Sequence, residues 1–132
     1  MTDASAPKRL VLVVEDDPDL RELMTRVLEK LGFGVLVASD GREGLAMASM
    51  KPRPSLIISD VMMPDMDGIE MVRAIKNDSQ LRPTPVIFLT AKGMPQDVVA
   101  GIQAGARHYL IKPFRVPDLI AKVHAVLPPG GD

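Results

Sequence analysis

The chain has 132 residues, with 16 basic and 17 acidic side chains and a formal net charge of −1 at neutral pH. This length fits one domain, and a hydrophobic content of 46% is enough for one core. The balanced charge and the scarcity of aromatic residues argue against nucleic-acid binding by this chain. Cysteine is absent, which excludes disulfides and thiolate chemistry. No secretory signal or membrane-spanning stretch is recognisable, so we expect a cytoplasmic protein.

Short apolar runs alternate with helical patterns five times along the chain. Residues 10–14 form a continuous apolar run, which is typical of a strand buried on both faces. The apolar residues that follow recur three and four positions apart, which predicts a helix through about residue 31. Asp17 suits the N-cap of this helix, Pro18 its first turn and Gly32 its carboxyl-terminal stop.

The rest of the chain repeats this alternation. Apolar runs predict further strands at residues 35–38, 56–59, 86–89 and 109–111. Apolar periodicity predicts helices at residues 40–50, 69–75, 98–103 and 119–127. Asp40 followed by Glu43 resembles a capping box at the start of the first of these helices. The alternation predicts a parallel sheet with helices on both faces, since each crossover is right-handed.

Polar residues follow four of the five predicted strands. They are Glu15-Asp16-Asp17 after the first, Asp60 after the third, Thr90 after the fourth and Lys112-Pro113 after the fifth. In sheets of this kind, ligands bind outside the carboxyl ends of the strands. With Asp17 assigned to the helix cap, three carboxylates, a hydroxyl and an ammonium group are expected to converge at one edge of the sheet.

The types of these side chains restrict the chemistry of the predicted site. Clustered carboxylates raise one another's pKa unless a cation joins them. Oxygen ligands without Cys or His select a hard ion, Mg²⁺ before a transition metal. A Mg²⁺ ion and a lysine ammonium would bind phosphoryl oxygens, and a neighbouring carboxylate can attack phosphorus to form an aspartyl phosphate. Such a transfer needs mainly positioning and charge neutralisation.

At these positions the sequence resembles the receiver domains of response regulators, the family typified by bacterial chemotaxis and two-component signalling proteins. Four motifs support the resemblance: Val13-Val14-Glu15-Asp16-Asp17, the segment from Asp60 to Gly68, Thr90-Ala91-Lys92, and Lys112-Pro113-Phe114. Four motifs in order at four strand ends are far more specific than any one of them. The resemblance implies a flavodoxin-like α/β fold, a doubly wound five-stranded parallel sheet of order 2-1-3-4-5 with five helices.

The resemblance also implies a role for each site residue. Asp60 corresponds to the phosphoacceptor. Glu15, Asp16, Asp60 and the backbone carbonyl of Met62 correspond to the Mg²⁺ ligands, with Glu15 acting through a water molecule. Thr90 and Lys112 correspond to the groups that contact the phosphoryl group.

Further consequences of the resemblance concern the switch. Tyr109 corresponds to the aromatic residue that changes rotamer together with Thr90, and the Lys112-Pro113 bond is expected to be cis. Lys92 is expected to influence the loss of the phosphoryl group. Many DNA-binding members have an acidic pair immediately before the tyrosine, where this chain has Arg107-His108.

The implied function is a phosphorylation-dependent signalling switch in a two-component phosphorelay. The chain would accept a phosphoryl group from a histidine kinase or a histidine phosphotransfer protein and change its affinity for a downstream protein through the face of its fourth helix, fifth strand and fifth helix. It would assist its own phosphorylation and dephosphorylation without being an enzyme in the usual sense. We expect a receiver domain over residues 9–127, flexible ends at 1–8 and 128–132, and a monomer or a weak phosphorylation-dependent dimer.

Other functions remain open at this point. The chain could be the receiver half of a larger regulator, or a docking module that works without phosphorylation. An aspartyl-phosphate phosphatase normally has a second Asp two residues after the nucleophile, where this chain has Met62. A flavin carrier needs a phosphate-binding loop after the first strand, and Glu15-Asp16-Asp17 would repel a phosphate there.

Overall fold

A computed structural model describes residues 8–63, 66–91 and 95–129, with Asp97 described by its backbone only. Five strands form the sheet: β1 (Leu10–Val14), β2 (Gly34–Ala38), β3 (Leu56–Asp60), β4 (Val86–Ala91) and β5 (His108–Lys112). Five helices connect and follow them: α1 (Pro18–Lys30), α2 (Gly41–Ala48), α3 (Gly68–Lys76), α4 (Pro95–Ala104) and α5 (Val116–Val126). All neighbouring strands pair in parallel in the order β2-β1-β3-β4-β5, which confirms the predicted topology.

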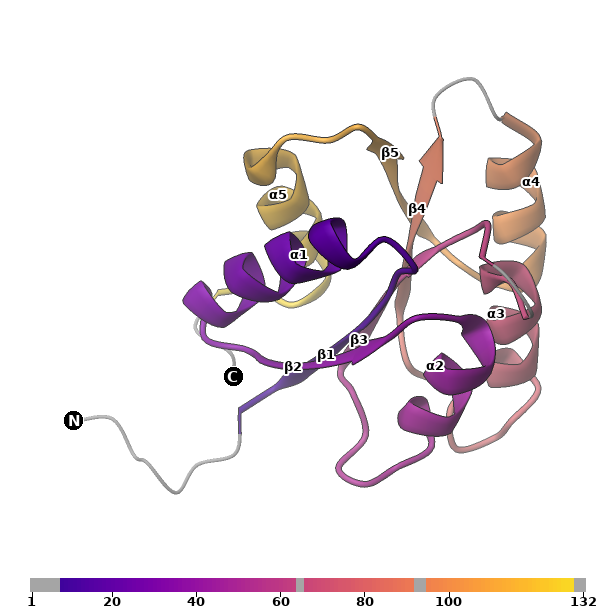
Figure 1. The fold of residues 1–132 in the computed structure, drawn as a ribbon. Helices are drawn as coiled ribbons and strands as arrows, with labels where there is room; N and C mark the ends of the chain where they lie inside the picture. Colours follow the sequence, from indigo (N-terminus) through magenta and orange to yellow (C-terminus); the bar gives the residue numbers. More distant parts are fainter. Residues whose placement is uncertain (1–7, 64–65, 92–94, 130–132) are drawn as a thin grey trace.

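Helices cover both faces of this sheet, as Figure 1 shows. On one face, α1 and α5 pack against residues such as Val13 and Ile58, and bury Met24 and Leu119 completely. On the other face, α2, α3 and α4 enclose a second core around Phe88. The central strands β1, β3 and β4 are buried on both faces because each is a nearly continuous apolar run, whereas the edge strands β2 and β5 carry exposed residues such as Val37 and Ile111.

The ends of the elements follow the local signals in the sequence with a few corrections. Asp17 caps α1, accepting a hydrogen bond from the backbone N–H of Asp19 at 3.0 Å, as predicted. Gly32 has a positive φ of 97°, a conformation that favours glycine after a helix end. The second helix ends at Ala48, before the predicted residue 50.

The capping box predicted at α2 is incomplete. The Asp40 carboxylate accepts from the N–H of Glu43 at 2.8 Å, but the Glu43 carboxylate accepts from the N–H of Ser39 and not from that of Asp40. A complete box lies at α3, between Asp67 and Glu70. Both arrangements satisfy backbone N–H groups at a helix start, so the sequence signal located the start of α2 correctly and misassigned one partner.

Other boundaries move by one or more residues. Strand β4 extends through Thr90 to Ala91, so Thr90 lies inside the strand and not after it. Strand β5 starts at His108, and α5 starts at Val116, three residues before the predicted start. None of the helices in the described residues is both long and apolar enough to cross a membrane.

Candidate functional site

The carboxyl ends of β1, β3 and β5 bring three charged side chains into direct contact. The Lys112 ammonium lies 2.8 Å from Glu15 Oε1 and 2.8 Å from Asp60 Oδ2. Glu15 is completely buried, while the side chains of Asp60 and Lys112 are 14% and 26% exposed. The predicted meeting of these three residues at one sheet edge is therefore present in the structure.

Burial and charge act together on these groups. Burial raises the pKa of Glu15, and the nearby Asp60 charge raises it further, while Lys112 opposes both. Burial alone would lower the pKa of Lys112, but hydrogen bonds and charges from Asp60 and Glu15 outweigh burial and raise it. The site thus holds two carboxylates together with one resident cation.

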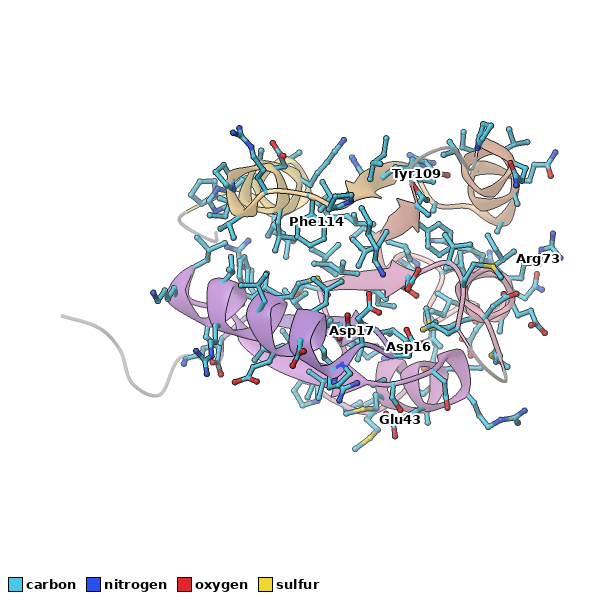
Figure 2. The ribbon with its side chains drawn as sticks, turned by 45° about the horizontal axis from the view of Figure 1, so that its top comes forward. Asp16, Asp17, Glu43, Arg73, Tyr109 and Phe114 are labelled. Carbon is cyan, nitrogen blue, oxygen red and sulfur yellow. The ribbon has the colours of Figure 1, made fainter. Side chains whose placement is uncertain are left out.

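Backbone contacts fix the direction of the acidic side chains. Glu15 Oε2 accepts from the N–H of Asp17 at 3.1 Å, and Asp60 Oδ1 accepts from the N–H of Met62 at 3.3 Å. Figure 2 shows Asp16 and Asp17 where β1 passes into α1, with Glu43 farther away on α2. Asp16 itself is exposed and accessible from solvent.

The acidic groups also fit a metal ion. Carboxylate oxygens of Glu15, Asp16 and Asp60 all lie within 4.8 Å of one another. Glu15 Oε1 is buried without a well-aligned hydrogen bond, although the Lys112 ammonium is close to it. A donor set of oxygens alone suits a hard divalent cation such as Mg²⁺.

The residues predicted for the switch lie on the neighbouring strands β4 and β5. Thr90 is buried at 1% exposure, on the strand next to Asp60. Tyr109 is half-buried, its hydroxyl donates to the carbonyl of Ala106 at 3.3 Å, and its ring centroid lies 6.3 Å from that of Phe88. Burial raises the pKa of Tyr109. The Lys112-Pro113 peptide bond is cis, as predicted.

Pro64, Asp65 and Lys92 lie outside the described residues, so the expected influence of Lys92 on dephosphorylation stays a prediction. Met62, which follows the acceptor, is 63% exposed.

Two residues that position the site were missed by the sequence interpretation. Arg21, in α1, donates to the backbone carbonyl of Glu15 at 2.8 Å and ties the acidic segment to the helix. Gly101, in α4, lies so close to Phe88 and Tyr109 that an added Cβ would stand 2.8 and 2.9 Å from them. No spacing in the sequence indicates either contact. Each contact joins a helix residue to a side chain or carbonyl whose position depends on the folded structure.

Gly68 is the third such residue and has a direct structural link to the acceptor. Its N–H donates to the carbonyl of Val61 at 2.9 Å, and an added Cβ would collide with the backbone carbonyl of Asp60. In the sequence, Gly68 stands out only as the last residue of the motif that begins at Asp60. The structure shows that α3 can approach the end of β3 only because this residue lacks a side chain.

We expect Gly68→Ala to lower the free energy of unfolding by about 1–3 kcal/mol, the usual cost of overpacking, and to slow phosphorylation by displacing Asp60. Urea unfolding and the rate of phosphorylation by an acyl phosphate measure the two effects. Gly32→Ala is the matched control, since its Cβ would meet nothing within 4 Å and its cost of about 1–2 kcal/mol comes only from the positive φ. Equal slowing of phosphorylation in both variants would show that Gly68 has no particular effect on the acceptor.

The fold and the site together define a class of protein. A doubly wound parallel sheet of this order, with acidic residues after β1, an aspartate ending β3 and a lysine ending β5, is typical of phosphoacceptor signalling domains. The chain matches the response regulator receiver domain family over residues 11–124. It therefore belongs to the receiver domains of two-component response regulators, a family of phosphoacceptor signalling domains rather than classical enzymes.

Individual relatives agree with this assignment. The DNA-binding response regulator MtrA of Mycolicibacterium smegmatis is 42% identical over 120 residues, covering 91% of this chain and 51% of that protein. The chain thus spans about half the length of the curated relatives it matches.

Two solved structures resemble this chain over nearly their whole length. The chemotaxis response regulator CheY4 of Vibrio cholerae has a TM-score of 0.84 and 39% identity, covering 91% of this chain and 99% of that one. The receiver domain of sensor histidine kinase PA1611 from Pseudomonas aeruginosa, solved with a magnesium ion in its active-site cleft, has a TM-score of 0.82 and 30% identity, covering 92% of this chain and 98% of that one.

Proposed function

We propose that Asp60 is the phosphoacceptor of this receiver domain and that its phosphorylation switches the affinity of the chain for a partner protein. The observation that supports this most directly is the Lys112 ammonium, 2.8 Å from an Asp60 oxygen at the open edge of the sheet. Such a cation next to a carboxylate nucleophile is placed to neutralise the charge of an incoming phosphoryl group. Asp60 remains partly exposed, so a donor can reach it.

We assign a Mg²⁺ site to Glu15, Asp16, Asp60 and the backbone carbonyl of Met62. The proximity of the three carboxylates and the complete burial of the Glu15 side chain support this assignment. The magnesium in the related receiver domain of PA1611 is consistent with it. When bound, Mg²⁺ would neutralise charge on the phosphoryl oxygens and on the carboxylates.

The proposed reaction uses few groups of this chain. The Asp60 carboxylate attacks the phosphorus of a phosphohistidine, and the bond from phosphorus to the imidazole nitrogen breaks. Lys112 holds a phosphoryl oxygen during transfer and in the product. Thr90 then turns its hydroxyl toward the phosphoryl group, and Tyr109 moves into the space that this leaves. In the same arrangement, water removes the phosphoryl group again, so the chain assists both its phosphorylation and its dephosphorylation.

The partner surface in this proposal is the face formed by α4, β5 and α5. Val99, Ile102 and Ile111 are more than half exposed on it, which suits a protein contact. Tyr109 belongs to the same strand, so its rotamer change would alter this surface. The phosphoryl donor would be a histidine kinase or a histidine phosphotransfer protein in the cytoplasm, and the domain would extend over residues 9–127.

A second candidate function is the receiver half of a larger regulator. The observation that favours it is the coverage of relatives such as MtrA, of which this chain matches 51%. In that case the phosphorylated face would act on an attached output domain and not on a separate protein. The chemistry at Asp60 is the same in both candidates.

The intact mass of the protein after incubation with an acyl phosphate, with and without Mg²⁺, tests the proposed function. We expect a gain of one phosphoryl group that requires Mg²⁺ and disappears when the ion is chelated. No gain with the acyl phosphate or with a phosphorylated histidine kinase would contradict the proposal and favour a docking module that works without phosphorylation.

Thr90→Ala separates acceptance from switching. We expect the variant to accept the phosphoryl group at a rate within a few-fold of the wild type, because Thr90 contacts the group only after transfer. The NMR signal of the single tyrosine reports on the switch, since Tyr109 is the only tyrosine in the chain. We expect phosphorylation to shift this signal in the wild type and to leave it unchanged in Thr90→Ala. An equal shift in both proteins would contradict the proposed coupling.

A further inference from the structure

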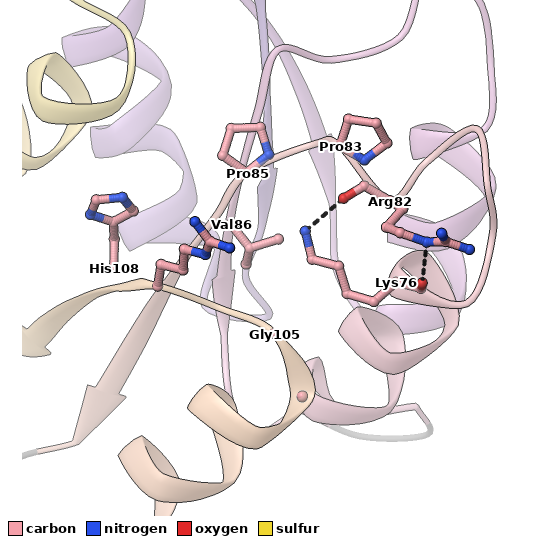
Figure 3. Close-up of a pocket in the computed structure, with 9 residues that line it drawn as sticks. Lys76, Arg82, Pro83, Pro85, Val86, Gly105 and His108 are labelled. Carbon is pink, nitrogen blue, oxygen red and sulfur yellow. Dashed lines mark hydrogen bonds between the residues drawn. The ribbon is translucent and has the colours of Figure 1, made fainter.

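A pocket lies at the amino-terminal edge of the sheet, opposite the phosphoacceptor site. It has a volume of about 580 Å³ and is lined at the starts of β4 and β5 by Val86 and His108. The end of α3, the loop that follows it and the end of α4 form the other walls. Figure 3 shows Lys76 and Arg82 on one side of this pocket and His108 on the other. This volume falls within the range of small-molecule sites, about 300–1,000 Å³.

The charge of the lining is entirely of one sign. Lys76, Arg82, Arg107 and His108 line the pocket, and no carboxylate belongs to the lining among the described residues. None of these four side chains forms an ion pair with an acidic residue in the described part of the chain. The whole chain has a net charge of −1, so this concentration of basic side chains does not reflect its average composition.

Lys76 is held in place by hydrogen bonds to neutral groups, which do not compensate its positive charge. Its ammonium donates to the carbonyls of Arg82 and Thr84, each at 2.9 Å, and these are neutral partners. The stem of Lys76 lies against Gly105, whose positive φ of 119° and missing side chain allow this close approach. Burial and the charge of Arg107 both lower the pKa of Lys76. Lys76 and Arg107 thus repel each other across a space without a counterion.

Some N–H donors of these basic side chains already bond to neutral backbone carbonyls, and the other N–H donors are available to a ligand. Arg82 Nε donates to the carbonyl of Lys76 at 3.0 Å, which compensates the carboxyl end of α3. The Lys76 ammonium has three N–H groups and uses two of them in the bonds above. The imidazole of His108 offers an N–H donor in either charge state. Pro83 and Pro85 form part of the wall and offer no backbone N–H groups.

We propose that this pocket binds a small phosphate-bearing anion between Lys76, Arg107 and His108. Guanidinium and ammonium groups form strong charge-assisted hydrogen bonds with phosphate oxygens, and a bound anion would relieve the repulsion between Lys76 and Arg107. The concave shape and the modest volume favour a small molecule over an extended acidic segment. The site is separate from Asp60, since the two lie at opposite ends of the parallel strands.

NMR titration of the ¹⁵N-labelled protein with inorganic pyrophosphate tests the proposal. The titration is done without Mg²⁺ and at constant ionic strength, so that neither the metal site nor general screening contributes. We expect saturable shifts of the backbone amides of Lys76, Gly105, Arg107 and His108. The same shifts are expected in Asp60→Asn, because this pocket does not include the acceptor.

A charge-reversal pair provides the control. Arg107→Glu is expected to weaken pyrophosphate binding by about tenfold or more, since it replaces an attractive charge with a repulsive one. Arg42→Glu makes the same change of net charge at an exposed position on α2 and is expected to leave the affinity within about twofold.

Three outcomes would overturn the proposal. Shifts that do not saturate would indicate screening only, and equal weakening in Arg107→Glu and Arg42→Glu would indicate a general charge effect. If a hexaglutamate peptide shifts the same amides at lower concentration than pyrophosphate, the pocket belongs to an acidic protein segment.

Discussion

Asp60→Asn is expected to abolish phosphorylation by an acyl phosphate, with no gain in intact mass at any Mg²⁺ concentration. The amide oxygen of Asn is a poor nucleophile, and the substitution also removes one of the three carboxylates that lie within 4.8 Å of one another. The fold should remain intact, because Asn retains the shape of the side chain and an acceptor for the Lys112 ammonium. Loss of the Asp60 charge also removes one of the influences that raise the pKa of Glu15.

A second aspartate provides the matched control for this experiment. Asp40 caps α2 by accepting a hydrogen bond from the N–H of Glu43, and Asn is an equally good N-cap residue. We therefore expect Asp40→Asn to be phosphorylated like the wild type and to be equally stable. A Mg²⁺-dependent gain in mass that persists in Asp60→Asn would mean that another residue accepts the phosphoryl group, and peptide mapping would identify it.

The elements and their order follow from signals that lie within a few residues of one another. Asp17, Pro18 and Gly32 bound α1 as expected, since a cap, a first-turn proline and a positive-φ glycine act locally. The site was also predictable, because the carboxyl ends of parallel strands meet at one edge, where Glu15 follows β1 and Asp60 and Lys112 end β3 and β5. Local signals together with one topological rule were enough for both.

Contacts set by the packing of distant segments could not be predicted in this way. Nothing in the sequence around Gly68 or Gly101 indicates which side chains and carbonyls approach them, so these close contacts could be read only from the packing. The burial of Thr90 within β4 depends on the length of that strand, which its apolar run of four residues understated. The basic pocket joins Lys76 to Arg107, which lie 31 positions apart, so no spacing pattern connects them.

Lys112→Met is expected to have opposite effects on catalysis and on metal binding. The Met side chain has a length similar to that of Lys but lacks the ammonium group, which lies 2.8 Å from both Glu15 and Asp60. The rate of phosphorylation by an acyl phosphate should fall on the order of 10²-fold, the usual loss when one preorganised donor to a developing charge is removed. Lys122→Met, a change of the same charge on α5, should leave the rate unchanged.

Mg²⁺ binding is expected to become tighter in Lys112→Met by about tenfold, because the ammonium no longer repels a divalent ion from the same carboxylates. NMR titration of the variant and of the wild type with Mg²⁺, both at the same pH, measures this change. Slower phosphorylation with tighter Mg²⁺ binding would mean that Lys112 acts on the phosphoryl group itself. Slower phosphorylation with weaker Mg²⁺ binding would mean that the lysine serves only to hold the two carboxylates in place, and its proposed contact with the phosphoryl group would then be wrong.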